Sequence, residues 1–241
     1  MPWVAGVDGC RAGWVVALLQ QTPERPEHHV QLCANFAHVL TLTPQPAVIA
    51  IDIPIGLLDE PQPGGRECDR QARRLLGRRA SSVFTPPTRP LLKATRYEQV
   101  RPYGLSIQAF NILPKIREVD RLMTPALQQS VFEAHPELAL MSFAGFSMQH
   151  NKKTHEGREE RLRTLERAPQ GLFRGIRKTF ESALKSFKRT QAAPDDLLDA
   201  YVLAWTALCI ANSRASCIPT DPLVDRKGLR MEIWYGLLPQ R

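Results

Sequence analysis

The sequence predicts an α/β layer fold in which a mixed sheet starts with three antiparallel strands, continues with parallel strands and is flanked by helices. Residues 3–8 and 14–19 are apolar, β-rich runs joined by five residues with a glycine at each end, which favours a hairpin. A third run, residues 29–34, follows a proline-containing linker. Residues 48–53 are apolar except for one aspartate, a pattern typical of an interior, parallel strand.

Helical patterns account for most of the remaining chain. We expect helices over residues 35–42, 68–79, 105–123, 151–168, 172–187 and 194–212. Pro114 should kink the third of these helices, because proline removes one main-chain hydrogen bond. One more strand is expected over residues 131–137, ending in a His-Pro-Glu sequence.

The composition predicts a globular protein with a buried core. Hydrophobic residues make up 43% and charged residues 23% of the 241 residues, close to the averages for such proteins. We expect a single domain over residues 1–241 with a Pro/Arg-rich, helical insertion at about residues 57–130. No apolar run reaches the ~20 residues of a membrane span, and no signal peptide is recognisable, so we expect a cytoplasmic protein without membrane contact. The five cysteines contain no Cys-x-x-Cys pair and should be reduced thiols.

The net charge bears on the partner. Lys and Arg number 32 and Asp and Glu 24, which gives 32 − 24 = +8. A polyanionic partner such as nucleic acid fits this excess, and so does simple solubility charge.

Asp8 and Asp52 are single carboxylates in otherwise apolar strand patterns. Burying an unpaired carboxylate in a sheet has a large desolvation cost, which a metal ion or another partner must offset. Asp8 ends the first predicted strand, where it either opens into a metal site or caps the following turn. Asp52 leaves a similar choice between a metal ligand and a buried acceptor of N–H groups from the turn at residues 54–56.

A third acidic feature begins the last predicted helix, where Pro194 precedes three aspartates. Capping is a sufficient explanation for Asp195 and Asp196, because the first turn of a helix favours anions. Asp199 lies three residues after Asp196, so the two carboxylates share a face and repel each other unless a cation lies between them.

These acids are the hard oxygen ligands of a two-metal hydrolytic site, in which Mg²⁺ or Mn²⁺ ions lie about 4 Å apart. One ion activates the attacking water and the other stabilises the leaving oxygen. No His or Cys spacing typical of zinc competes with this interpretation. We expect the metal ligands and catalytic carboxylates to be Asp8, Asp52, Asp196 and Asp199.

Six segments together carry a resemblance to a known family: VDGCRAGW at 7–14, IDIPIGL at 51–57, RECDR at 66–70, SVF at 82–84, FEAHPE at 132–137 and DDLLDA at 195–200. As a set they resemble the domain-of-unknown-function 429 (DUF429) family, predicted nucleases of the ribonuclease H-like fold. That fold resembles ribonuclease H and Holliday-junction resolvases in placing one Asp on the first strand, an acid on the fourth and an Asp-x-x-Asp pair on the last helix. The resemblance implies the same four aspartates as ligands, with Asp195 as an alternate ligand or cap.

Glu133, His135 and Glu137 alternate along the strand predicted at residues 131–137, so they should share one polar face. One interpretation gives His135 a proton-transfer or phosphate-binding role and makes Glu133 or Glu137 an accessory metal contact. The other interpretation is a polar edge strand whose acids pair with nearby arginines.

Two groups of basic residues are candidates for phosphate binding. Arg66, Arg70 and Arg73 follow helical spacing in the insertion, so we expect this stripe to bind the substrate. The second group is interleaved with glutamates, which favours a solvated, self-paired face instead. Its members are Lys152, Lys153, Arg158, Arg161 and Arg163.

The leading hypothesis is a metal-dependent nuclease that hydrolyses phosphodiester bonds of DNA or RNA by a two-metal mechanism. The first alternative is an ATP-dependent phosphotransferase of the actin and sugar-kinase type, although the chain lacks the second copy of the first hairpin that such enzymes normally have. The second alternative is a non-catalytic nucleic-acid-binding protein in which the acids are structural.

Overall fold

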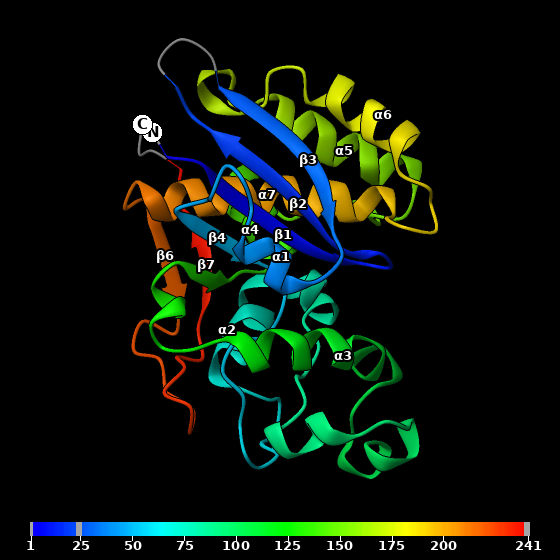
Figure 1. Cartoon of the computed structure of the whole chain (residues 1–241), viewed down its shortest axis with the longest axis vertical. Helices are drawn as coiled ribbons and strands as arrows, with labels where there is room; N and C mark the ends of the chain where they lie inside the picture. Colours follow the sequence, from blue (N-terminus) through cyan, green and yellow to red (C-terminus); the bar gives the residue numbers. More distant parts are fainter. Residues whose placement is uncertain (1, 23–25, 239–241) are drawn as a thin grey trace.

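A five-stranded mixed sheet organises the chain (Figure 1). The computed structural model describes residues 2–22 and 26–238. The strands are β1 (Val4–Cys10), β2 (Gly13–Gln20), β3 (Glu27–Cys33), β4 (Val48–Ile51) and β5 (Val131–Glu133). Their order is β3-β2-β1-β4-β5, with antiparallel pairs among the first three strands and parallel pairs β1–β4 and β4–β5. The expected mixed sheet with an antiparallel start is confirmed.

Helices flank the sheet, as expected. They are α1 (Phe36–Leu40), α2 (Glu67–Leu76), α3 (Ile107–Leu122), α4 (Pro136–Ala144), α5 (His155–Glu166), α6 (Ile176–Ser186) and α7 (Pro194–Ala211). Short 3-10 helices occur at Gly77–Ser82, Arg89–Lys93, Tyr97–Gln99, Arg101–Tyr103, Leu127–Gln129 and Pro169–Gly171. Between β4 and β5 the chain is therefore helical, with α2 and α3 as its longest elements. Helix α3 continues through Pro114.

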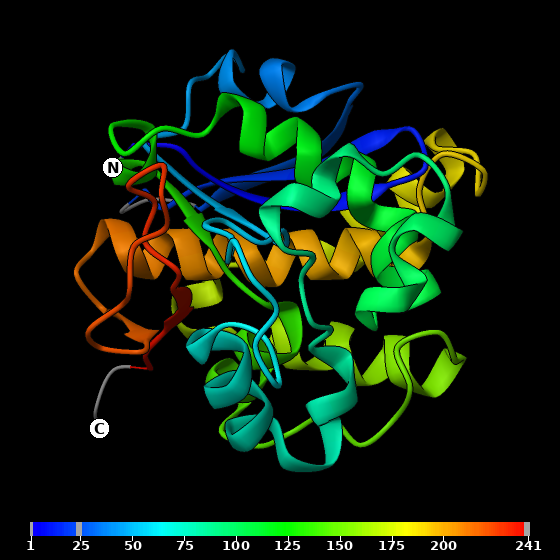
Figure 2. The same ribbon diagram turned by 90° about the horizontal axis from the view of Figure 1, so that it is seen from below.

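The sheet separates two hydrophobic cores, because successive side chains of a strand point to opposite faces. Val15 and Ala17 of β2 belong to the core that contains α4, α5, α6 and α7. Val16 and Leu18 belong to the core that contains α1 and α3. In Figure 2 the blue strands accordingly lie between α7, in orange, and the green helix α3.

Helix α7 lies directly on β1 because small residues meet at the contact. A Cβ atom added to Gly6 would lie 2.0 Å from both the carbonyl oxygen of Ala200 and the amide nitrogen of Ala204. Such a distance is far below any van der Waals contact, so only glycine allows this approach. The contact brings the acidic start of α7 to the end of β1 that carries Asp8.

Several element boundaries differ from the sequence prediction, and three of them bear on the site. The strand expected over residues 48–53 ends at Ile51, so Asp52 directly follows it. The strand expected over residues 131–137 ends at Glu133, and Pro136 begins α4, since proline suits the first turn of a helix and cannot donate within a sheet. Glu133, His135 and Glu137 therefore do not share one strand face. The first strand, expected to end at Asp8, continues to Cys10.

The C-terminal part of the described chain adds a small second sheet that the sequence pattern did not predict. It consists of β6 (Ala215–Ile218) and β7 (Ile233–Gly236), which pair antiparallel. Trp234 of β7 forms a parallel bridge with Ala134, so this sheet continues from the β5 side of the main one. Among the described residues, no helix has the length and apolar character needed to span a membrane.

Candidate functional site

A cleft of about 1090 Å³ opens where β1 and β4 end and α7 begins. Asp8, Asp52, Asp195 and Asp196 are among the residues that line it. Asp199, one turn further along α7, is 1% exposed and lies close enough to Asp8 for its charge to raise the pKa of that residue. The four aspartates predicted as a single site are thus brought together from three separate elements.

The sheet register places Asp8 beside Asp52. Val7 and Ile51 are paired in the parallel β1–β4 ladder, and the amide of Asp52 donates to the carbonyl of Val7 at 2.9 Å. The next side chain on each strand therefore points to the same face, which is the α7 face because Gly6, two residues before Asp8, contacts that helix. Two carboxylates consequently stand next to each other under α7.

Hydrogen bonds bear on the alternatives left open for these two acids. Asp8 Oδ1 accepts the amide of Gly9 at 2.7 Å, so the turn-capping interaction exists beside the cleft position. Asp52 does not accept a hydrogen bond from the amide of Ile55 in the following turn, because that N–H donates to Glu133 Oε2 at 2.6 Å. Asp52 thus differs from Asp8 in lacking this local main-chain donor.

Asp196 and Asp199 of α7 make different contacts. Asp196 Oδ2 accepts the amide of Ala193 at 2.8 Å, as the capping explanation predicts, and the residue also lines the cleft. Asp199 Oδ2 accepts a hydrogen bond from Lys152 Nζ at 2.6 Å, whereas its buried Oδ1 has no hydrogen-bond partner. An unpartnered carboxylate oxygen in the protein interior is costly, and a water molecule or an ion commonly satisfies such a group.

The acidic cluster has too little positive charge nearby to balance its carboxylates. Burial raises the pKa of Asp8 well above its ordinary value, and the charges of Asp52 and Asp199 raise it further. Burial likewise raises the pKa values of Asp52 and Asp199, and it raises that of Asp196 to about 6. These carboxylates repel one another, as expected for acids that share too few cations.

The carboxylates of this cluster supply the hard oxygen donors that Mg²⁺ and Mn²⁺ prefer. One of their oxygens has no partner, and a bound cation would reduce the repulsion between their charges. Within the part of the chain that the structure describes, however, no three or more His, Cys, Asp or Glu side chains form a group able to hold an ion as they stand. The donor chemistry thus fits a divalent ion, and binding one requires side chains of the cluster to reorient.

Basic side chains surround these acids, and the sequence pattern did not assign them to the site. Lys115, Arg11, Lys153 and Arg189 line the cleft together with Lys152. Lys115 Nζ lies 4.5 Å from the ring centroid of Trp14 and donates to the carbonyl of Gly13. The charge of Asp199 raises the pKa of Lys152 and keeps its ammonium protonated. Lys152 belongs to a group whose interleaved glutamates suggested a solvated face, and no sequence signal marked Lys115.

His135 lies on the other side of Asp52. Both line a small cavity of about 20 Å³, and the nearby His135 and Lys152 lower the pKa of Asp52 against the larger, raising effect of burial. The ring Nε2 is 3.3 Å from the carbonyl oxygen of Ser82, and the buried Nδ1 has no hydrogen-bond partner. The imidazole is therefore close to the cluster and retains one uncommitted ring nitrogen.

A family model described as "Protein of unknown function (DUF429)" matches residues 6–223. The chain belongs to this family. The match extends from β1 through α7 and so includes every acid of the cleft. Neither the curated proteins nor the solved structures gave a match to this chain.

In this DUF429 chain the two predicted glutamates are paired with arginines, as the alternative interpretation had it. Arg66 donates to Glu133 from both terminal nitrogens, at 2.8 and 2.6 Å. Glu137, in the first turn of α4, pairs with the fully buried Arg161. Neither glutamate lines the large acidic cleft.

In the DUF429 chain, the arginines predicted to bind substrate instead make internal bonds in and around the helical segment between β4 and β5. Arg66 is 2% exposed and also binds Asp69 at 2.7 Å. Arg70 pairs with Glu67 at 2.7 Å, and Arg73 donates to the carbonyls of Val83 and Gly64. None of Arg66, Arg70 and Arg73 lines the acidic cleft.

Proposed function

We propose that this protein is a divalent-metal-dependent nuclease that hydrolyses phosphodiester bonds of nucleic acid. The observation that carries the proposal is the meeting of carboxylates from β1, from the residue directly after β4 and from α7 in one cleft whose walls carry lysine and arginine side chains. Carboxylates suit Mg²⁺ or Mn²⁺, and a basic wall suits a phosphate backbone. The net charge of +8 agrees with a polyanionic partner.

We also propose a ribonuclease H-like fold. The sheet order with antiparallel β1, β2 and β3 followed by parallel β4 and β5 supports it. The positions of the acids support it further, with one on the first strand, one directly after the fourth and an Asp-x-x-Asp pair on the last long helix.

The residues of the cleft have distinct roles in this proposal. Asp8, Asp52 and Asp199 hold the ion, and Asp196 contributes charge from the wall of the cleft while it caps α7. When bound, the ion supplies Lewis-acid chemistry and a more acidic water. Lys115, Lys153 and Arg189 contact the phosphates on either side of the scissile bond. His135, beside Asp52, accepts or donates a proton through its uncommitted Nδ1.

The test is cleavage of DNA, RNA, junction and flap substrates by the purified chain with Mn²⁺. The wild-type protein should cleave at least one of them, and Asp8→Asn should lower the rate about 100-fold or more, because a carboxylate needed in the transition state is lost. Circular dichroism should show that the variant is folded. Asp221→Asn, which removes an exposed carboxylate outside the cleft, serves as the matched control and should cleave normally. Absence of cleavage on every substrate, together with retained binding, would favour a non-catalytic nucleic-acid-binding protein.

A further inference from the structure

The ammonium of Lys152 lies inside the acidic cluster. Its Nζ is 2.6 Å from Asp199 Oδ2 and 3.7 Å from Asp195 Oδ2, and the side chain is 36% exposed. Its positive charge also lowers the pKa of Asp8 and of Asp52, the two acids on the sheet side of the cluster. Lys152 thus holds a position where an oxygen-liganded cation would otherwise bind the acids of α7.

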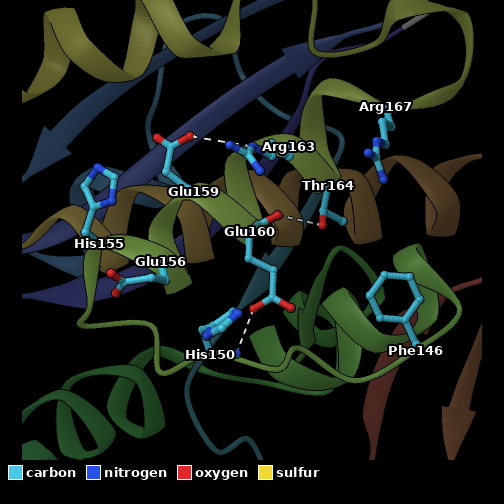
Figure 3. A pocket seen from close by; sticks show the side chains of 9 residues that line it. All are labelled: Phe146, His150, His155, Glu156, Glu159, Glu160, Arg163, Thr164 and Arg167. Atoms are coloured by element: carbon cyan, nitrogen blue, oxygen red, sulfur yellow. Dashed lines mark hydrogen bonds and ion pairs between the residues drawn. The ribbon is translucent and has the colours of Figure 1, made fainter.

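The loop that carries Lys152 is anchored on both sides. Glu160 of α5 accepts the amides of Gln149 and His150 at 2.7 and 2.9 Å, and Figure 3 shows its carboxylate directed at His150. Arg79, from the insertion, donates to the carbonyl of Met148 at 2.9 Å. The segment immediately before Lys152 is therefore fixed to two separate elements.

The same loop turns tightly after Lys152. The amide of Thr154 donates to the carbonyl of Asn151 at 3.0 Å, and the Thr154 side chain caps α5 by accepting the amide of Gly157 at 3.1 Å. Fixed residues before and after Lys152 limit the positions that its main chain can take. These main-chain bonds on both sides distinguish Lys152 from a surface lysine, whose side chain forms a weak and variable ion pair.

We infer that Lys152 is a permanent cation of the acidic site and that the site consequently takes one divalent ion instead of two. The inference rests on the proposed metal-dependent function and replaces the two-ion arrangement expected from the sequence. One oxygen of Asp199 is bound to the ammonium and only Oδ1 is left for an ion. A second ion near Asp195 and Asp199 meets the positive charge of Lys152 at short range, and like charges there repel.

Lys152 then provides the charge that the second ion provides in a two-ion enzyme. An ammonium group is a compact point charge with three donors, so it can neutralise a phosphate oxygen while it stays bound to Asp199. The lysine is a positioning and charge-neutralising group for the phosphate, and no proton needs to leave it.

The experiment is the Mn²⁺ stoichiometry of the full-length protein, measured by isothermal titration calorimetry and by native mass spectrometry. Wild-type protein should bind one Mn²⁺ per chain. Lys152→Met, which keeps the length of the side chain and removes its charge, should double this number to two. Lys153→Met is the matched control, because Lys153 lines the same cleft and is exposed, and it should remain at one.

Electron paramagnetic resonance of the wild-type protein needs no variant and tests the same point. With excess Mn²⁺ it should show the spectrum of isolated ions. An exchange-coupled Mn²⁺ pair in the wild-type protein, or a stoichiometry of one in folded Lys152→Met, would overturn the inference and leave the proposed nuclease function standing. Absence of Mn²⁺ binding in all three proteins would overturn both.

Discussion

Two clusters of buried charge lie at the same end of the parallel strands, and they differ in how their charges are balanced. In the cluster at β5, Arg66 donates to both Asp69 and Glu133, and these bonds occupy the guanidinium and both carboxylates. In the cluster at β1 and α7, several carboxylates share Lys152, and Asp199 keeps an oxygen without a partner. Burial of a carboxylate alone therefore does not separate a structural acid from a candidate ligand; the number of partners that its oxygens have does.

The two clusters are neighbours, which makes this difference informative. The small cavity beside His135 is lined by Asp52 from the unmatched cluster and by Arg66 and Glu133 from the matched one. Glu133 also accepts the amide of Ile55 and so fixes the turn that follows Asp52. The matched cluster thereby supports the main chain from which the unmatched cluster is built.

The largest expected effect comes from breaking the matched cluster. Arg66→Met leaves the carboxylates of Asp69 and Glu133 buried without their counter-ion, which should lower the free energy of unfolding by about 3 to 5 kcal/mol. Urea denaturation measures this change. Arg74→Met is the control, since the Arg74 side chain is 69% exposed, and it should unfold as the wild type does. Equal stability of the two variants would mean that the Arg66 network is not structural.

A smaller effect is expected when a cation is added to the unmatched cluster. Mn²⁺ at one hundred times its dissociation constant should stabilise the folded protein by about 3 kcal/mol, because it binds the folded state alone. Thermal unfolding with increasing Mn²⁺ measures the shift. Asp8→Asn should remove most of it. A melting temperature that does not respond to Mn²⁺ would make the acids a structural feature.

The smallest effect should appear without any metal. Burial and neighbouring charges raise the pKa of Asp8, so its ionised form is less stable in the folded protein than in the unfolded chain. Asp8→Asn removes that charge, retains an oxygen that can accept the amide of Gly9, and should raise the free energy of unfolding by about 1 kcal/mol. Chemical denaturation in the presence of a chelator measures it. A loss of stability would show that the ionised carboxylate is matched after all.

The sequence predicted those features that depend on local pattern. The first hairpin follows from two apolar runs and a glycine-bounded connection, and it is confirmed. The neighbouring positions of Asp8 and Asp52 follow from lone acids at corresponding ends of strands that proved to be paired. The strand at residues 131–137 was predicted too long, because the alternation of polar residues outweighed the helix-starting preference of Pro136.

Features that depend on distant contacts were beyond the sequence. Glu133 and Arg66 are 67 residues apart, and Lys152 and Asp199 are 47 apart. Nothing in the local composition distinguishes Lys152, which binds Asp199, from Lys153, which lines the same cleft without an ion pair to the α7 acids. The spacing of arginines in the insertion looked suitable for phosphates, yet the same spacing serves a network of internal bonds around Arg66.

The contact between Gly6 and α7 has a consequence for how the site tolerates change. The separation of the sheet acids from the helix acids is set by main-chain atoms in direct contact, with no layer of side chains between them. Substitutions that enlarge or shrink hydrophobic side chains elsewhere in the two cores therefore leave this separation unaltered. The distance between the acids of the sheet and those of α7 is therefore independent of how the side chains of the hydrophobic cores change. This independence rests on Gly6, the one position of the contact that has no side chain.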